Sequence, residues 1–178
     1  IDTNIRGTVE LLQRCVAQGD IRRVLYSSSG GTVYGDFVSD TPIPEATATN
    51  PVSPYGRGKV AIENYLSYFN RKYQLDYTIF RIANPYGERQ PLLRKQGVIP
   101  IFADLILKGK PITVYGYGSM VRDYIYVKDV AEIMADALQN EALKNETVNS
   151  GSGMGETINQ IIAEPEKTIG QTAIIEYK

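Results

Sequence analysis

Residues 23–36 read RVLYSSSGGTVYGD, and this stretch joins a short apolar segment directly to a run of serines and glycines. A β-branched, apolar run of this length that is followed by turn residues indicates a buried strand over 23–28. The next three residues, Ser29-Gly30-Gly31, are expected to form a loop. In sheets of parallel strands, ligands bind at the carboxyl ends of the strands. Residues 27–31 are therefore the first candidate for a functional site.

The segments on either side of this stretch alternate between helical and strand patterns. Residues 4–17 carry apolar side chains at helical spacing and are followed by Gly19, a typical helix stop. Further helices are expected over 55–73, 98–107, 127–138 and 157–162, and further strands over 77–82, 112–116, 121–127, 146–150 and 172–177. This alternation predicts an α/β fold, with a doubly wound, mostly parallel sheet. Residues 83–87 also follow a strand and are the second candidate site.

The composition of the 178 residues excludes several classes of chemistry. The chain has no histidine and one cysteine, Cys15, which excludes Ser-His-Asp and Cys-His catalysis and zinc held by histidines or thiolates, so no metal site is expected. A single cysteine allows no internal disulfide, which fits a reducing cytoplasm. The net charge of −1 favours neither nucleic acid nor an anionic membrane as a partner. No apolar run reaches the roughly 18 residues of a membrane span.

A tyrosine and a lysine lie one helical turn apart in SPYGRGK, residues 53–59. Positions i and i+4 of a helix share a face, so Tyr55 and Lys59 are expected to project to the same side. A free phenol has a pKa of about 10, and a neighbouring ammonium favours its ionised form. The pair is thus suited to take a proton from a hydroxyl group, and a serine of residues 27–29 can relay that proton. The alternative is two ordinary surface residues, because this spacing also arises by chance.

Six motifs occur in a specific order: DTNIRGTVELL, SSSGGTVYGD, SPYGRGK, RIANPYG, QGVIP and VRDYIYVKDVA. Together they resemble the extended short-chain dehydrogenase/reductase family and are most similar to its nucleotide-sugar 4-epimerases, of the UDP-galactose 4-epimerase type. The resemblance covers nearly the whole chain. It implies a partial Rossmann-like doubly wound sheet with part of a small substrate-binding domain, and it implies NAD as the cofactor.

The resemblance also implies roles for individual residues. The implied catalytic residues are Ser29, Tyr55 and Lys59, with Ser28 as the alternative serine because the loop is one residue longer than the usual Ser-Ser-x-x-x-Tyr-Gly form. The implied cofactor contacts are Asn4, Ser27, Tyr55, Lys59 and Ile82. The implied substrate contacts are Thr32, Asn84, Val98, Tyr115 and Arg122. Among these, Arg122 is suited to clamp a diphosphate, and Tyr115 is expected against the base.

Two charged positions have a structural interpretation. Arg122 has the alternative of an ion pair with Asp123 or Asp129. Asp129 opens a predicted helix and is expected to cap it rather than to serve a site.

The family begins with a Gly-x-x-Gly-x-x-Gly turn that holds the cofactor pyrophosphate, and this chain has no such opening. The nearest imitation is GSGMG at 151–155, with Glu156 at the third glycine position and Pro165 expected to interrupt the helix. It is therefore expected to be an ordinary strand-to-helix loop. The chain resembles a fragment, with segments of the NAD-binding domain at 1–84 and 127–150 and segments of the substrate domain at 85–126 and 151–178.

Two hypotheses for function follow. In the first, the intact protein is a homodimeric enzyme that epimerises a nucleotide sugar at C4 through a transient 4-keto sugar. The substrate is a UDP-hexose, a UDP-N-acetylhexosamine or a lipid-linked diphosphate sugar. A dehydratase or reductase of the same family is the alternative enzyme, but no Asp-Glu pair follows the serines, as the related dehydratases need. In the second hypothesis, the chain is a non-catalytic fragment or binding module.

Overall fold

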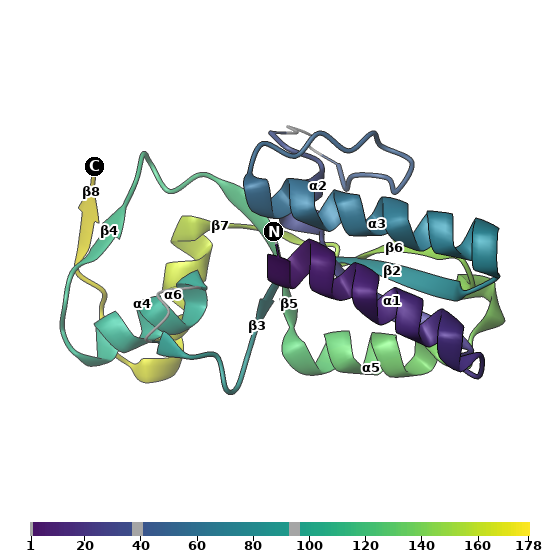
Figure 1. Cartoon of the computed structure of the whole chain (residues 1–178). Helices are drawn as coiled ribbons and strands as arrows, with labels where there is room; N and C mark the ends of the chain where they lie inside the picture. The colour runs from purple at the N-terminus through teal and green to yellow at the C-terminus, as the bar shows by residue number, and fades with distance from the viewer. Residues whose placement is uncertain (1, 37–40, 93–96) are drawn as a thin grey trace. The chain divides into compact units, whose positions relative to one another are not determined.

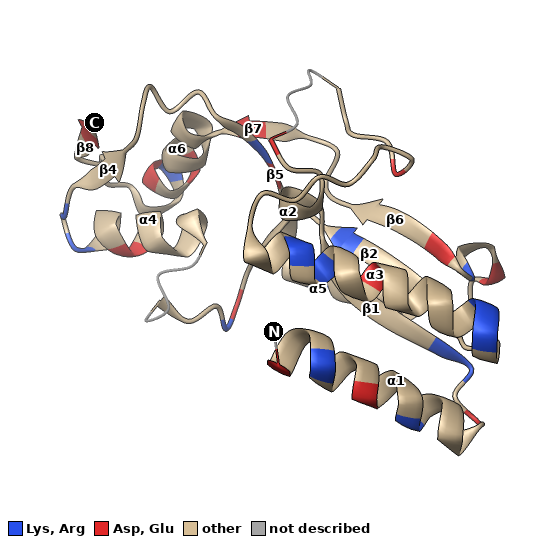
Figure 2. Ribbon diagram, turned by 45° about the horizontal axis from the view of Figure 1, so that its top comes forward, with Lys and Arg blue, Asp and Glu red and all other residues tan. Residues whose placement is uncertain are grey.

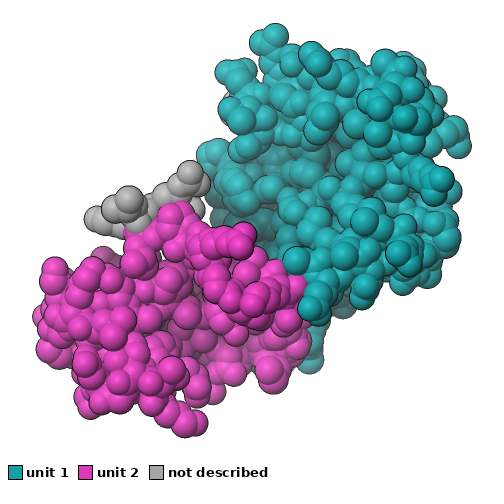
Figure 3. Space-filling view, turned by 90° about the horizontal axis from the view of Figure 1, so that it is seen from below, with its two compact units in different colours: residues 1–83, 130–150 teal, residues 84–129, 151–178 magenta. Residues whose placement is uncertain are grey.

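The computed structural model describes residues 2–36, 41–92 and 97–178. The chain divides into two compact units, whose residues are coloured separately in Figure 3. Unit 1 comprises residues 1–83 and 130–150, and unit 2 comprises residues 84–129 and 151–178. Each unit is thus built from two segments that are far apart in the sequence.

Unit 1 is built on a sheet of three parallel strands (Figure 1). In spatial order these are β1 (Arg23–Ser29), β2 (Asp76–Ile82) and β6 (Glu146–Ser150). The register pairs Ser29 with Ile82, and Ile82 with Ser150, so the carboxyl ends of the three strands are level. The parallel α/β sheet predicted from the sequence is confirmed.

Helices cover both faces of this sheet. They are α1 (Gly7–Gln18), α3 (Pro54–Tyr73) and α5 (Val127–Ala137), together with the short segments η1 (Asp2–Arg6), α2 (Gly30–Val33) and η3 (Glu141–Leu143). Successive side chains of a strand point to opposite faces. Ser28 Oγ donates to Glu63 of α3, whereas Ser27 Oγ donates to Met134 Sδ of α5 at 3.8 Å. α3 and α5 therefore cover opposite faces, and the sheet is doubly wound.

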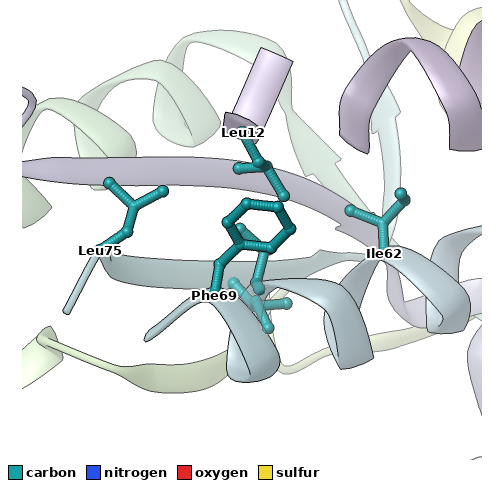
Figure 4. Packing of buried hydrophobic residues seen from close by; sticks show 6 residues of the cluster. Leu12, Ile62, Phe69 and Leu75 are labelled. Carbon is teal, nitrogen blue, oxygen red and sulfur yellow. The ribbon is translucent and has the colours of Figure 1, made fainter. Parts of the chain in front are cut away.

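The face under α1 and α3 carries the main apolar core of unit 1. Figure 4 shows Leu12 of α1 beside Phe69 of α3, with Ile62 and Leu75 on either side. All four side chains are almost fully buried. α1 ends where the sequence predicts, because Gly19 adopts the left-handed conformation at a φ of 80°.

The described residues of unit 2 form two small sheets, and the helices α4 (Val98–Leu107) and α6 (Ile158–Ile169) pack together. The strands of unit 2 are β3 (Asn84–Tyr86), β4 (Ile112–Val114), β5 (Val121–Tyr126), β7 (Gly155–Thr157) and β8 (Ile175–Tyr177). β5 pairs with β3 in parallel and with β7 antiparallel, and β4 pairs with β8 in parallel. α4 and α6 pack on an apolar core that includes Phe102, Ile112 and Ile162.

The loop expected at 29–31 is instead the entry into one turn of helix. Ser29 is the last residue of β1, and α2 begins at Gly30. A side chain has no room at this position, because a Cβ on Gly30 would lie 2.9 Å from the carbonyl oxygen of Arg81. Glycine thus lets the chain turn tightly over the end of β2, which the serine and glycine content alone did not reveal.

Two expectations near the C-terminal helix are wrong. Residues 151–155 lead into β7 rather than directly into a helix, and α6 continues through Pro165 to Ile169. A proline removes one backbone hydrogen bond, but Thr157 forms a capping box with Gln160 and the apolar face of α6 is buried against α4. These interactions offset the lost hydrogen bond.

Asp129 is not the cap of its helix. α5 begins at Val127, so Asp129 lies in the first turn. A carboxylate is still stabilising at this position, because the helix dipole is positive at its N-terminus.

Charged side chains of both signs are interspersed within each unit (Figure 2). This distribution accords with the net charge of −1. None of the helices in the described part of the chain combines the length and apolar character needed to cross a membrane.

Candidate active site

Tyr55 lies in the first turn of α3, where the local sequence fixes the start of the helix. Ser53 is the N-cap, and its Oγ accepts a hydrogen bond from the N–H of Gly56 at 3.0 Å. Pro54 occupies the first helical position, which needs no N–H group. The Tyr55 side chain is 52% exposed, so its phenol is accessible to a ligand.

Lys59 follows one turn later and is anchored to the end of β1. Its Nζ donates to the carbonyl oxygen of Ser27 at 2.6 Å. The same Nζ lies 5.0 Å from the ring centroid of Tyr26 and 5.6 Å from that of Tyr55. Burial lowers the pKa of Lys59, and the carboxylate of Glu63 opposes that shift. The ammonium is therefore held next to the exposed phenol.

The three serines at the end of β1 have different surroundings. Ser28 is 5% exposed, and its Oγ donates to the carboxylate of Glu63. Ser27 is exposed and bonds to Met134 on the other face of the sheet. Ser29 is half-buried at the last position of the strand, directly before α2. The hydroxyl of Ser28 is thus directed into the interior and bonded to Glu63.

A further hydroxyl lies close to the start of α3. The carbonyl oxygen of Thr32, in α2, is so near to Gly56 that a Cβ on this glycine would lie 2.7 Å away. Gly56 thus lets α2 pack directly against the turn that carries Tyr55. The buried Thr32 Oγ1 has no hydrogen-bond partner within the described residues.

Two other expected cofactor residues lie on separate elements of unit 1. Asn4 is exposed in η1, and the side chain of its neighbour Ile5 reaches Gly58 of α3. Ile82 ends β2 beside Ser150, whose buried Oγ also lacks a partner among the residues described. The carboxyl edge of this sheet therefore contains a buried hydroxyl, that of Ser150, whose hydrogen bonding is incomplete within the described residues.

Unit 2 contains a cavity of about 260 Å³ that brings together Asn84, Val98 and Arg122. All three are among the residues expected to contact the substrate. Asn84 is oriented by a hydrogen bond from its Nδ2 to the carbonyl oxygen of Asp123 at 2.7 Å. Apolar side chains such as Met120 complete the wall.

Arg122 is an exposed residue of β5 whose Nη1 donates to the carbonyl oxygen of Val121 at 3.0 Å. The described residues form no salt bridge with Arg122. The neighbouring Asp123 is occupied elsewhere, because its carboxylate accepts hydrogen bonds from the N–H and Oγ of Ser152 and from the N–H of Gly153. The guanidinium of Arg122 thus does not form the ion pair with Asp123 or Asp129 that was the alternative interpretation.

Tyr115 does not line the cavity. It follows β4 and is 82% exposed. The next residue, Gly116, adopts a φ of 70°, which turns the chain directly after Tyr115. A contact between Tyr115 and a base stays a prediction.

Sequence reasoning missed Glu63, Arg81 and Asp123. Glu63 is four residues after Lys59 and so continues the helical face of the Tyr-Lys pair, which was the available signal. Arg81 stands out as a charge inside the buried strand DYTIFRI. Asp123 gave no such signal, because an Arg-Asp sequence suggests a local ion pair.

Comparison with known proteins places this arrangement in a family. The model of the NAD dependent epimerase/dehydratase family matches residues 1–151. The chain belongs to this family. The resemblance deduced from the six motifs is thereby confirmed.

Solved structures of the family have the same fold. The UDP-glucose 4-epimerase of Thermotoga maritima, determined with UDP-glucose, superposes with a TM-score of 0.94 at 38% identity over 99% of this chain and 56% of that one. The UDP-glucose 4-epimerase of Thermus thermophilus, in complex with NAD, has a TM-score of 0.87 at 33% identity over 97% of this chain and 56% of that one.

A relative with a different activity is about equally similar. The dTDP-4-dehydro-6-deoxyglucose reductase of Escherichia coli is 38% identical over 156 residues, which are 88% of this chain and 48% of the relative. The chain spans about half the length of the curated relatives it matches. Family membership thus establishes the fold, and relatives of similar identity carry different activities.

Proposed function

We propose that the protein carrying this chain is an NAD-dependent enzyme that epimerises a nucleotide sugar at C4 through a transient 4-keto sugar. The observation that supports it is the fixed ammonium of Lys59, 5.6 Å from the ring centroid of the exposed Tyr55. A positive charge beside a phenol favours its ionised form, and a phenolate can remove the proton of a sugar hydroxyl. Tyr55 is therefore the proposed base.

The side chains of unit 1 fit part of a cofactor site. An ammonium has three donors, and the bond to Ser27 uses one of those on Lys59. Asn4 is exposed, and Thr32 and Ser150 have buried hydroxyls without a partner among the described residues. We assign Asn4, Ser27, Lys59 and Ile82 to NAD. Bound there, NAD would supply a reversible hydride acceptor for the sugar carbon.

A hydroxyl next to Tyr55 is proposed to relay the sugar proton. Ser28 is poorly suited, because its Oγ already donates to Glu63. Ser29 is the proposed relay residue. Thr32 is the second candidate, because its free Oγ1 lies in the helical turn that packs against Gly56.

Unit 2 is proposed to hold the nucleotide part of the substrate. Arg122 has a guanidinium without a salt bridge in the part of the chain that the structure describes, and this group can bind two phosphate oxygens at once. Asn84 and Val98 line the same cavity. The cavity thus combines a guanidinium that suits a diphosphate with an apolar wall. The proposed substrates are UDP-hexoses and UDP-N-acetylhexosamines.

A reductase is the second candidate function, because the relative from Escherichia coli carries that name at 38% identity. Both reactions use a tyrosine that exchanges a proton with a sugar oxygen. The two reactions differ in whether the hydride returns to the same sugar. The presence of a Tyr-Lys pair does not distinguish between them.

The deciding experiment is the full-length protein purified without added cofactor. Mass spectrometry of the denatured supernatant is expected to show retained NAD, and incubation with UDP-glucose or UDP-N-acetylglucosamine is expected to give the 4-epimer without added NADPH. NADPH-dependent reduction of a nucleotide-linked 4-keto sugar, with no epimer formed from either UDP sugar, would favour the reductase. Loss of both NAD and turnover would leave a binding module.

A further inference from the structure

A buried ion pair joins α3, the helix of the Tyr-Lys pair, to strand β2. Arg81 Nη2 and Glu63 Oε2 are 2.8 Å apart, and the two side chains are 9% and 7% exposed. Arg81 Nε adds contacts of 3.3 Å to both carboxylate oxygens. A gain in folding stability does not explain a buried ion pair, because apolar residues of similar volume often give equal or greater stability. The pair therefore calls for another role.

Glu63 continues the face of α3 that carries the proposed base. Tyr55, Lys59 and Glu63 are spaced four residues apart, so they follow one another along one side of the helix. Lys59 Nζ binds the carbonyl oxygen of Ser27, and Glu63 accepts the hydroxyl of Ser28. Two consecutive turns of α3 are thus fastened to two consecutive residues of β1.

Arg81 completes this fastening from the neighbouring strand. It is paired in register with Ser28, and its Nη1 donates to the hydroxyl of Tyr34 at 2.9 Å. The Tyr34 hydroxyl in turn donates to Asn149 Oδ1 of β6 at 2.7 Å. Glu63 is therefore held by a network that reaches all three strands of unit 1, and it has little freedom to move.

We propose that Glu63 and Arg81 are positioning residues, which hold Lys59 at the carbonyl of Ser27 and place a carboxylate one helical turn beyond its ammonium. Glu63 sets the geometry by fixing Ser28, the residue after the Lys59 acceptor. Glu63 also places a negative charge near Lys59, because it lies one turn further along the same face of α3. Arg81 holds Glu63 in place, because its guanidinium contacts both carboxylate oxygens. The catalytic role of Lys59 rests on the proposed function, whereas its placement by Glu63 and Arg81 does not.

The groups around Lys59 make the charge effect specific. The ring of Tyr26 from β1 and the ring of Tyr55 from α3 both lie near Nζ, and the carboxylate of Glu63 raises the pKa of Lys59 against the effect of burial. Burial raises the pKa of Tyr26 far above its ordinary value, so this phenol stays neutral near pH 7. Removal of the Glu63 charge is therefore expected to lower the pKa of Lys59 further.

The test reads Lys59 directly and needs no substrate. The full-length protein is acetylated for short times across pH 6–11, and peptide mass spectrometry follows the midpoint of Lys59 labelling. In Glu63→Gln the midpoint is expected at lower pH than in the wild type, so labelling at pH 8 increases. Glu10→Gln is the matched control, because Glu10 forms an exposed ion pair with Arg6 on another helix of unit 1. This control is expected to leave Lys59 unchanged.

A second variant covers the case in which Glu63→Gln leaves Arg81 unpaired and does not fold. Glu63→Gln/Arg81→Met removes both charges and retains the approximate volume, and its Lys59 midpoint is expected between those of the wild type and the single variant. A folded single or double variant with the wild-type midpoint would overturn the proposal. An equal shift in Glu10→Gln would also overturn it, because the effect would then follow net charge alone. Either result is independent of whether the enzyme epimerises sugars.

Discussion

The two units use polar side chains in opposite ways. In unit 1, the charged groups under α3 are bonded to one another, with Glu63 shared between Ser28 and Arg81. In unit 2, Arg122 borders a cavity of about 260 Å³ and has no salt bridge in the described residues. A group that performs proton transfer needs a fixed position, whereas a group that binds a charged ligand must be free to receive it. The contrast therefore accords with the proposed roles, proton transfer in unit 1 and nucleotide binding in unit 2.

The strongest test of this division is the proposed base. In the full-length enzyme, Tyr55→Phe is expected to lower turnover by roughly 10³ or more, since acid–base catalysis typically contributes 10²–10⁴. Retained NAD should not change, because the substitution removes only the phenolic oxygen. Lys59→Ala should instead reduce both turnover and retained NAD. Epimerisation and cofactor content are measured on the same samples, and near-wild-type turnover in Tyr55→Phe would rule out this base.

The next test decides which hydroxyl assists Tyr55. Ser29→Ala is expected to lower turnover by roughly 10², and Ser28→Ala is expected to act mainly on stability, because its hydroxyl donates to Glu63. Thr32→Val keeps the shape of the side chain and removes its hydroxyl, so it isolates the second candidate. The three variants are assayed at matched NAD content.

The outcomes of that comparison are distinct. A large loss in Thr32→Val with little effect of Ser29→Ala would transfer the relay to Thr32. A catalytic loss confined to Ser28→Ala, without a change in melting temperature, would contradict the structural role given to this serine.

These assignments show how far the sequence reaches. The Tyr55–Lys59 spacing and the serines after an apolar strand were sufficient to predict the helix, the strand and the side on which the pair lies. The fate of the Ser28 hydroxyl was not predictable, because it depends on Glu63, which is 35 residues away along the chain. The one-turn helix at Gly30 was missed for the same reason, since the constraint comes from the backbone of Arg81 on another strand.

The binding half is tested at Arg122. Arg122→Lys keeps the positive charge but loses the two parallel donors, so UDP affinity is expected to fall about tenfold. Arg71→Lys, in the last turn of α3, is the matched control and should bind as the wild type does. Titration calorimetry with UDP measures both variants. Equal affinity of Arg122→Lys and the wild type would remove Arg122 from the binding site.

The smallest effect is expected in a surface cluster of unit 2, where Glu88 and Lys128 are exposed. Hydrogen bonds from Tyr126 and Lys128 lower the pKa of Glu88 to about 2, from its ordinary value of 4.5. Between these values the unfolded chain binds more protons than the folded one, so the stabilising contribution is complete above pH 4.5 and is lost as the pH falls towards 2. Glu88→Gln should therefore reduce the dependence of the melting temperature on pH in this window. Because the cluster is exposed, salt should weaken the difference. A variant whose melting curve falls with acid as steeply as the wild type would show that the Glu88 cluster contributes nothing to acid sensitivity.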